Sequence, residues 1–273
     1  MKSLVIDLTK CVGCYNCQIA CKDEHVENDW TPIAKPQPDI GQFWMKMNET
    51  TRGTVPKVKL SYVPVPCMHC NNAPCMTAAT GGAIYRRPDG IIIIDPAKSA
   101  GQKQLVAACP YGAIYWNDAL GIPQKCTMCA HLLDKGWKEP RCVDACPTRA
   151  LIFGEEADLK DQLGKAEVFH PEYGTDPRIR YIQLPKRFIA GAIYDPKEDL
   201  CLEGAGVTTI DLTTAAVYAA KTDNYGDFWF EGLEPDHVYS VKIELPGYYD
   251  KIFGAVYTEK DVNLGDIALY KKT

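Results

Sequence analysis

Several features that would assign a function directly are missing from this chain of 273 residues. No apolar run approaches the roughly 20 residues that a membrane-spanning helix needs. Residues 1–10 carry neither a signal peptide nor a twin-arginine leader, so we expect a cytoplasmic protein. No glycine-rich phosphate loop lies between a strand and a helix, which argues against a nucleotide site on this chain.

The sequence also lacks a basic surface. Its formal net charge is −5, and residues 184–273 hold nine Lys+Arg against fifteen Asp+Glu. Neither part of the chain has the excess of lysine and arginine that is typical of a nucleic-acid binder. The histidines His25, His131, His170 and His237 are scattered without a metal-binding spacing, and we expect them at the surface.

Cysteine, in contrast, is abundant and clustered, because twelve of the thirteen fall in two dense blocks. The first block has the spacing C-x2-C-x2-C-x3-C. Thiolates are soft ligands, and each iron of a [4Fe–4S] cluster takes one. Twelve thiolates supply three such clusters with none left over, which predicts an electron-transfer protein. The twelve are Cys11, Cys14, Cys17, Cys21, Cys67, Cys70, Cys75, Cys109, Cys126, Cys129, Cys142 and Cys146.

A topological rule of two-cluster ferredoxins predicts how these cysteines are shared. Three closely spaced cysteines hold one cluster, and a fourth, often followed by proline, reaches across to the other. Cys109 and Cys146 both precede a proline. We therefore expect a first set of Cys11, Cys14, Cys17 and Cys146, a second set of Cys21, Cys126, Cys129 and Cys142, and a third set of Cys67, Cys70, Cys75 and Cys109.

An internal repeat indicates that a fourth cluster has been lost. Residues 109–114 and 146–151 both run Cys-Pro-x-x-Ala followed by Ile or Leu, and a third copy at 79–84 has alanine in place of cysteine. Counting back from Cys109 by the ferredoxin spacing gives Leu105, Gln102 and Ser99. These three and Ala79 are the four positions that one more cluster would need.

Zinc and disulfides are the competing explanations for so many cysteines. Structural zinc sites usually pair C-x2-C motifs across a longer loop, whereas triplets followed by Cys-Pro are typical of iron–sulfur proteins. A chain of this size can form its own core, and without a secretory signal we do not expect it in an oxidising compartment. Cys201 stands apart, and we expect it to be buried or half-buried with no ligand role. His69 is expected either to hydrogen-bond near a cluster or to face solvent, and not to bind iron.

The two parts of the chain differ in pattern. Residues 1–183 are typical of an α+β ferredoxin-like (polyferredoxin) domain with insertions. We expect in it a strand at 4–6, a long insertion at 31–65, a hairpin at 82–94 and a short helix at 158–166. Residues 188–273 hold about seven short apolar runs separated by turns, which predicts an all-β antiparallel sandwich. The expected strands are 188–194, 207–210, 216–218, 228–230, 239–243, 252–257 and 267–270.

Two resemblances add to this interpretation. Residues 1–183 resemble the iron–sulfur β subunits of the dimethyl-sulfoxide-reductase family of molybdenum enzymes, on the first cysteine run, on Pro-Cys-Met-His-Cys-Asn-Asn-Ala-Pro-Cys at 66–75, and on the motifs at 89–95, 108–112 and 125–129. The segment Gly226–Leu233 resembles the carboxypeptidase-regulatory-like, Cna-B-like sandwich domains. Three clusters followed by a sandwich look like the small subunits of the pyrogallol–phloroglucinol transhydroxylases, the anaerobic phenol hydroxylases and the catechol dehydroxylases.

This resemblance implies a heterodimer with a large catalytic subunit, which would carry molybdenum bound by two pterin guanine dinucleotides and the substrate site. No catalytic residue is then expected on this chain. The cluster of the first set would lie nearest the molybdenum, and the lost cluster would have faced a membrane subunit, so no membrane anchor is expected. Three functions stay open. The chain is the electron-transfer subunit of a transhydroxylase of polyhydroxylated aromatics, or that of a soluble hydroxylase or dehydroxylase with a soluble electron donor or acceptor, or a free-standing polyferredoxin.

Overall fold

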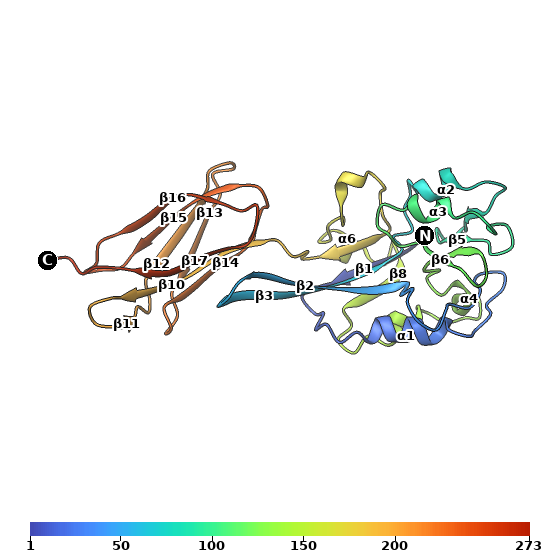
Figure 1. Cartoon of the computed structure of the whole chain (residues 1–273), viewed down its shortest axis with the longest axis horizontal. Helices are drawn as coiled ribbons and strands as arrows, with labels where there is room; N and C mark the ends of the chain where they lie inside the picture. Colours follow the sequence, from blue (N-terminus) through green and yellow to red (C-terminus); the bar gives the residue numbers. More distant parts are fainter. The chain divides into compact units, whose positions relative to one another are not determined.

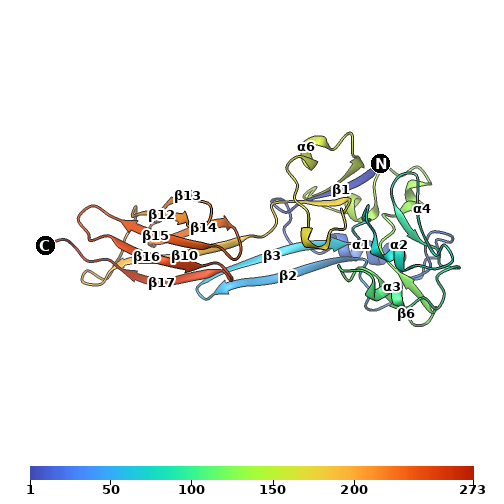
Figure 2. The same cartoon turned by 90° about the horizontal axis from the view of Figure 1, so that it is seen from above.

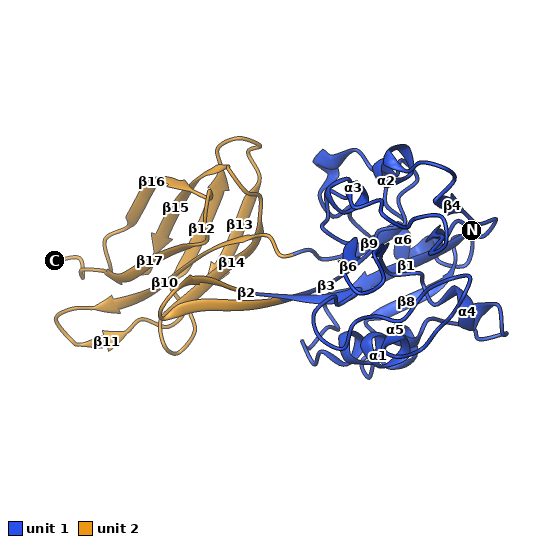
Figure 3. Cartoon of the chain, turned by 45° about the vertical axis from the view of Figure 1, so that its right-hand side comes forward, with its two compact units in different colours: residues 1–49, 62–184 blue, residues 50–61, 185–273 orange.

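The computed structural model describes all residues, 1–273. The chain forms two compact units (Figure 3). The first unit consists of residues 1–49 and 62–184, and the second unit of residues 50–61 and 185–273.

A three-stranded sheet with the strand order β8-β1-β9 organises the first unit (Figure 1). β1 (Lys2–Asp7) lies in the centre, because its apolar residues are buried on both faces of the sheet. β8 (Leu151–Glu155) pairs with it antiparallel, and β9 (Ile179–Ile182) pairs with it parallel. The sheet thus joins the beginning of the unit to its end, and the cysteine motifs lie in the chain between these strands.

The other elements of the first unit are short, because the cysteine motifs repeatedly turn the chain. Left-handed backbone occurs within these motifs at Tyr15, His69, Met128, Cys129 and Arg149. None of the helices is long and apolar enough to cross a membrane. The elements are α1 (Asn16–His25), α2 (Pro74–Ala78), β4 (Ile84–Arg86), β5 (Ile92–Ile94), α3 (Gln104–Ala107), β6 (Tyr115–Asn117), β7 (Ile122–Gln124), α4 (Ala130–Leu133), α5 (Arg141–Asp144), α6 (Lys160–Leu163) and a 3₁₀ turn (Pro171–Tyr173).

Several local predictions for the first unit are confirmed. The expected hairpin is formed by β4 and β5, and the expected short helix is α6. The insertion at 31–65 contains a regular feature that was not predicted, since β2 (Met45–Thr54) and β3 (Lys57–Pro66) form a two-stranded ribbon. The tip of this ribbon, residues 50–61, belongs to the second unit.

The second unit contains two four-stranded sheets (Figures 1 and 2). In one, β10 lies between β14 and β17, and β11 extends the edge; the other has the order β13-β12-β15-β16. One core of buried side chains from both sheets, including Ile189, Phe228 and Tyr239, joins them. The strands are β10 (Arg187–Asp195), β11 (Leu200–Cys201), β12 (Gly206–Asp211), β13 (Val217–Lys221), β14 (Asp227–Leu233), β15 (Val238–Glu244), β16 (Lys251–Tyr257) and β17 (Val262–Ala268).

All seven predicted strands of the second unit are present, although their bounds differ. The expectation of a wholly antiparallel sandwich is wrong for one pair, because β17 lies parallel to β10. β17 also begins earlier than expected, and the short edge strand β11 was not predicted.

Candidate metal centres

The first set of thiols meets around the start of α1. Cys11 and Cys14 lie in the loop after β1, Cys17 lies in the first turn of α1, and Cys146 follows α5. Burial, together with repulsion from the thiolates of Cys11, Cys146 and Cys14, raises the pKa of Cys17 to about 12. The fold therefore makes electrostatic neighbours of four cysteines that are separated by up to 135 positions in the chain.

The second set lies at the other end of the same helix. Cys21 is on α1 and Cys142 is on α5, and these two helices pack against each other. Burial, followed by repulsion from Cys129, Cys21 and Cys126, raises the pKa of Cys142 well above its usual value. Because Cys17 and Cys21 are four residues apart on α1, one face of this helix carries a thiol of each set.

The third set joins the end of the β2–β3 ribbon to α2 and α3. Cys67 directly follows β3, Cys75 is on α2, and Cys109 follows α3. Burial, and then repulsion from Cys67, with smaller contributions from Cys109 and Cys75, raises the pKa of Cys70 to about 12. These are the four thiols that the ferredoxin rule grouped together.

Electrostatic contacts connect the three sets in a row, with the second set between the other two. The thiol of Cys142, in the second set, is repelled by Cys17 of the first set. The thiol of Cys126, also in the second set, is repelled by Cys67 of the third set. The second set is thus electrostatically linked to both of the others.

The donor groups have the chemistry that an iron–sulfur cluster requires. Eight of the twelve thiols are buried, and buried thiolates need nearby positive charge, which iron supplies. The backbone N–H groups of Ala150 and Met128 lie 3.3 and 3.4 Å from the sulfurs of Cys146 and Cys126. No three His, Cys, Asp or Glu side chains converge closely enough to hold a single metal ion. A cubane instead binds its four cysteines through four separate irons.

Two histidines expected at the surface are in fact buried beside the second set. The imidazole of His25 is 1% exposed, and its Nε2 lies 3.9 Å from the sulfur of Cys129. Burial lowers the pKa of His25 to about 3, so the ring is neutral at pH 7. His131 stacks on Trp30 and its Nε2 lies 3.1 Å from Glu24. The prediction failed because both side chains are covered by segments far away in the chain.

His69 is fully buried, so the expectation that it faces solvent is excluded. Its Nδ1 accepts a hydrogen bond from the N–H of Ile92 at 3.0 Å, and its Nε2 has no partner. Burial lowers the pKa of His69 well below its usual value, which makes it a neutral ring between Met68 and Cys70. Cys201 is exposed on the edge strand β11, so the expectation that it is buried is wrong.

Of the four positions where the repeat predicts a further cluster, three are held by packing or hydrogen bonds within the protein. Ser99 and Leu105 are fully buried. The side-chain amide of Gln102 hydrogen-bonds to the backbone of Thr80 and to the carbonyl of Lys98. An aliphatic side chain and an amide therefore occupy positions where the repeat predicts thiolates.

Two protein families match separate parts of the chain, and individual relatives match most of its length. Residues 58–156 match the 4Fe-4S dicluster domain family, and residues 189–270 match the carboxypeptidase regulatory-like domain family. The pyrogallol hydroxytransferase small subunit of Pelobacter acidigallici is 40% identical over 97% of this chain and 98% of its own length. The arsenate respiratory reductase iron-sulfur subunit of Shewanella sp. ANA-3 is 32% identical (66% of this chain, 95% of the relative), and a sulfite dehydrogenase subunit of Allochromatium vinosum is 34% identical (72% and 87%).

Proposed function

Because the chain belongs to the iron–sulfur electron-transfer subunits of the molybdenum oxidoreductases, we propose that it holds three [4Fe–4S] clusters in a ferredoxin-like first unit. The proposed ligands are the three sets of thiols defined above. The observation that carries this proposal is the grouping of the twelve cysteines into three neighbouring sets of four.

Each cluster, when bound, can accept and release one electron. The residues of the chain provide the conditions for this. The buried positions of eight of the thiols keep water away from their sulfurs, and the N–H groups of Met128 and Ala150 stabilise thiolate charge. The row of sets gives electrons a path from the first set through the second set to the third. Helix α1 carries a thiol of the first set and a thiol of the second set, and so connects these two.

We assign the catalytic site to a large partner subunit that carries molybdenum bound by two pterin guanine dinucleotides, with the first set nearest that metal. The two chains would form a heterodimer that acts on polyhydroxylated aromatics, most closely in the manner of a pyrogallol–phloroglucinol transhydroxylase. Support comes from the relative named for pyrogallol hydroxytransfer, because the match covers almost the full length of both chains. No catalytic residue is proposed for this chain.

The loss of the fourth cluster suggests where the complex works. A cluster at Ala79, Ser99, Gln102 and Leu105 would extend the row beyond the third set, toward a membrane partner. We propose that its replacement by packed side chains removed the electron exit to such a partner and left a cytoplasmic complex. A membrane anchor chain in the purified native complex would contradict this proposal.

A second candidate function is supported by a groove of about 580 Å³ beside the third set. Asn71, Met76, Arg86 and Tyr173 are among the residues that line it, and Arg86 donates to the carbonyls of Cys70 and Asn71. Such a groove could receive a soluble electron donor or acceptor, as a hydroxylase or a catechol dehydroxylase requires. A free-standing polyferredoxin is a third candidate, but a diffusible carrier gains little from the second unit.

Iron content tests the ligand sets. The complex purified without oxygen is expected to contain about twelve iron atoms in this chain, and Cys109→Ser to lose about four of them. Cys201→Ser is the matched control, because this thiol is exposed and belongs to no set. A loss of iron in Cys201→Ser, or none in Cys109→Ser, contradicts the proposed ligands.

Turnover tests the function. The native complex is given pyrogallol and a polyhydroxybenzene co-substrate without oxygen and without an electron donor. Product formed under these conditions indicates a transhydroxylase, in which no net electrons enter or leave. Product formed only after addition of an electron donor or acceptor indicates a hydroxylase or dehydroxylase with this chain as its conductor.

A further inference from the structure

Lys125 is a buried cation without a carboxylate partner. Its side chain is 2% exposed, directly before Cys126 in the chain. The ammonium Nζ donates to the carbonyl oxygen of Ile92 at 2.5 Å and to that of Cys126 at 3.0 Å. Two backbone carbonyls satisfy hydrogen bonds but do not neutralise a charge, and a buried charge is costly unless an opposite charge lies nearby.

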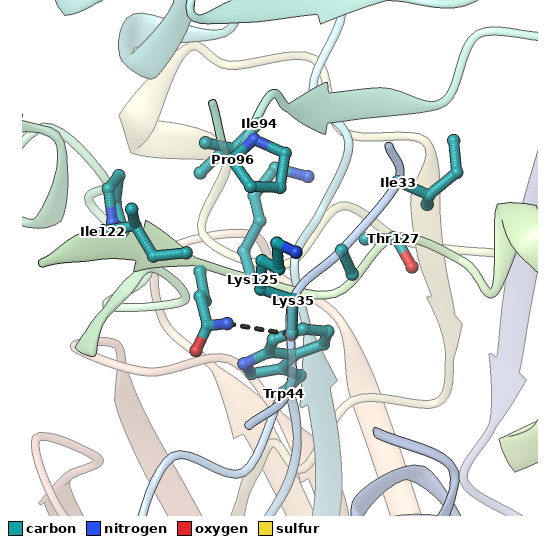
Figure 4. A pocket seen from close by; sticks show the side chains of 11 residues that line it. Ile33, Lys35, Trp44, Ile94, Pro96, Ile122, Lys125 and Thr127 are labelled. Carbon is teal, nitrogen blue, oxygen red and sulfur yellow. Dashed lines mark hydrogen bonds between the residues drawn. The ribbon is translucent and has the colours of Figure 1, made fainter. Parts of the chain in front are cut away.

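The pocket around the side chain is lined by no carboxylate. Figure 4 shows Lys125 in a small pocket whose other labelled residues are the apolar Ile33, Trp44, Ile94, Pro96 and Ile122 and the polar Lys35 and Thr127. The amide of Gln124, which also lines the pocket, is occupied by the carbonyl of Lys35. Nothing in this pocket supplies a negative charge to the ammonium.

The thiols whose pKa values the Lys125 ammonium affects belong to two different sets. The ammonium lowers the pKa of Cys126, in the second set, and of Cys75 and Cys109, in the third set, although burial raises each of them more strongly. The pKa of Cys17, in the first set, is governed by burial and by its own set. The missing opposite charge is therefore available from the second and third sets together.

We propose that the fixed positive charge of Lys125 raises the reduction potentials of the second and third clusters relative to that of the first. Reduction adds one electron, and hence one negative charge, to a cluster, and a nearby buried cation stabilises that added charge. The electron comes from the reductant or the neighbouring cluster, and no proton moves. This inference rests on the proposed ligand sets, and it makes electron transfer from the first cluster toward the other two energetically downhill.

The test is an anaerobic redox titration of the purified complex, followed by electron paramagnetic resonance. Lys125→Met keeps the length of the side chain and removes the charge. In this variant, we expect two of the three one-electron potentials to become more negative by about 59 mV. This shift corresponds to a roughly tenfold smaller equilibrium constant for reduction. The third potential is expected to stay unchanged. Lys138→Met, which removes an exposed charge between Cys129 and Cys142, is the control and should move none.

Iron content separates failure of this inference from failure of the ligand sets. A variant with full iron and three unchanged potentials overturns the role of Lys125 and leaves the ligand sets intact, as does an equal shift of all three. If Lys125→Met loses iron, the iron contents of Lys125→Gln and Lys125→Arg show whether the charge or the shape of the side chain is required. Iron retained only by Lys125→Arg supports a requirement for the charge, whereas iron lost in all three variants means that side-chain shape is what matters. Iron retained by Lys125→Gln allows its potentials to be measured, with the same two shifts expected.

Discussion

The side chain of Gln102 is hydrogen-bonded in both directions to the backbone of Thr80. Its Oε1 accepts from the Thr80 N–H at 3.0 Å, and its Nε2 donates to the Thr80 carbonyl at 3.2 Å. Thr80 directly follows Ala79, so this amide joins two of the positions where the repeat predicts cluster ligands. A pair of hydrogen bonds thus connects two segments in which the repeat predicts cluster ligands.

Gln102→Ala tests whether this amide holds the segments around Thr80 and Lys98 together. The variant loses the bonds to Thr80 and to the carbonyl of Lys98, and because the site is partly exposed we expect a loss of about 1 kcal/mol in unfolding free energy. Hydrogen exchange should accelerate at Thr80 and its neighbours. Gln104→Ala, an exposed glutamine two residues later, is the control. Unchanged exchange at Thr80 would show that the amide has no structural role.

A second prediction concerns Gly13, which lies between two cysteines of the first set. Its φ is +66°, and a Cβ at this position would stand 2.5 Å from Cγ of the Tyr62 ring. Gly13→Ala should therefore cost more than the 1–2 kcal/mol or so of left-handed backbone strain alone. Because Gly13 lies between Cys11 and Cys14, a displaced backbone should move both thiols, and we expect the loss of about four iron atoms from the first set.

Two variants separate the contact with the ring from the backbone strain. Gly41→Ala has a similar φ of +69° but no atom within 4 Å of the new Cβ, so it should retain all of its iron. Gly13→Ala combined with Tyr62→Ala should recover iron, because the ring that obstructs the methyl group is gone. Full iron in Gly13→Ala alone would refute the steric argument.

Much of this architecture could be predicted from local sequence signals. The spacing of the cysteines and the Cys-Pro repeats predicts the three sets of thiols, and apolar and β-branched runs bounded by turn residues predicted β10 and β12. The hairpin of β4 and β5 was recognisable because Arg87-Pro88-Asp89-Gly90 is a turn sequence flanked by apolar residues.

The features that were missed depend on contacts between distant segments. The pairing of β1 with β9 joins residues about 175 positions apart, and nothing in either strand identifies its partner. The ribbon of β2 and β3 was hidden because Pro64 and Pro66 lie in a strand, where proline usually argues against one. His25 and Lys125 carry polar side chains whose burial is decided by Trp44 and other residues from elsewhere in the chain.

The third prediction compares two lysines on the tip of the β2–β3 ribbon, both of which belong to the second unit. Lys57 is 5% exposed and forms an ion pair with Asp227, whereas Lys59 pairs with the exposed Glu231. Lys57→Met should cost about 2 kcal/mol, less than a fully buried pair would, because the Asp227 side chain remains 29% exposed.

Lys59→Met is the matched control and should cost less than about 1 kcal/mol. Both ammonium groups lie over the ring of Trp229, so the two variants lose a similar cation–π contact and differ mainly in the burial of the ion pair. Denaturant unfolding monitored by tryptophan fluorescence measures both costs. Equal costs would show that burial of the Lys57 pair contributes nothing.

The fourth prediction concerns acid and the carboxylate of Asp211 in the second unit. Burial opposes ionisation of this group, but Nδ1 of His237 at 2.8 Å, the N–H of Thr213 and the N–H and hydroxyl of Thr214 together lower its pKa below the usual range. A carboxylate with a lowered pKa in the folded state contributes stability above its unfolded pKa of about 3.9. This contribution is lost as the pH falls below that value toward the folded pKa.

Asp211→Asn removes the titrating group while preserving its shape. At pH 7 the variant should exchange backbone hydrogens faster than the wild type over residues 211–217. The difference should shrink as the pH falls below about 4, because the carboxylate of the locally opened wild type then becomes protonated while the folded one stays ionised. Each comparison is made at a single pH, so the intrinsic exchange rate cancels. Asp236→Asn, an exposed carboxylate next to His237, should match the wild type throughout. A difference between Asp211→Asn and the wild type that grows on acidification would have the opposite sign to that required by a lowered pKa, and would show that Asp211 is not stabilised as a carboxylate.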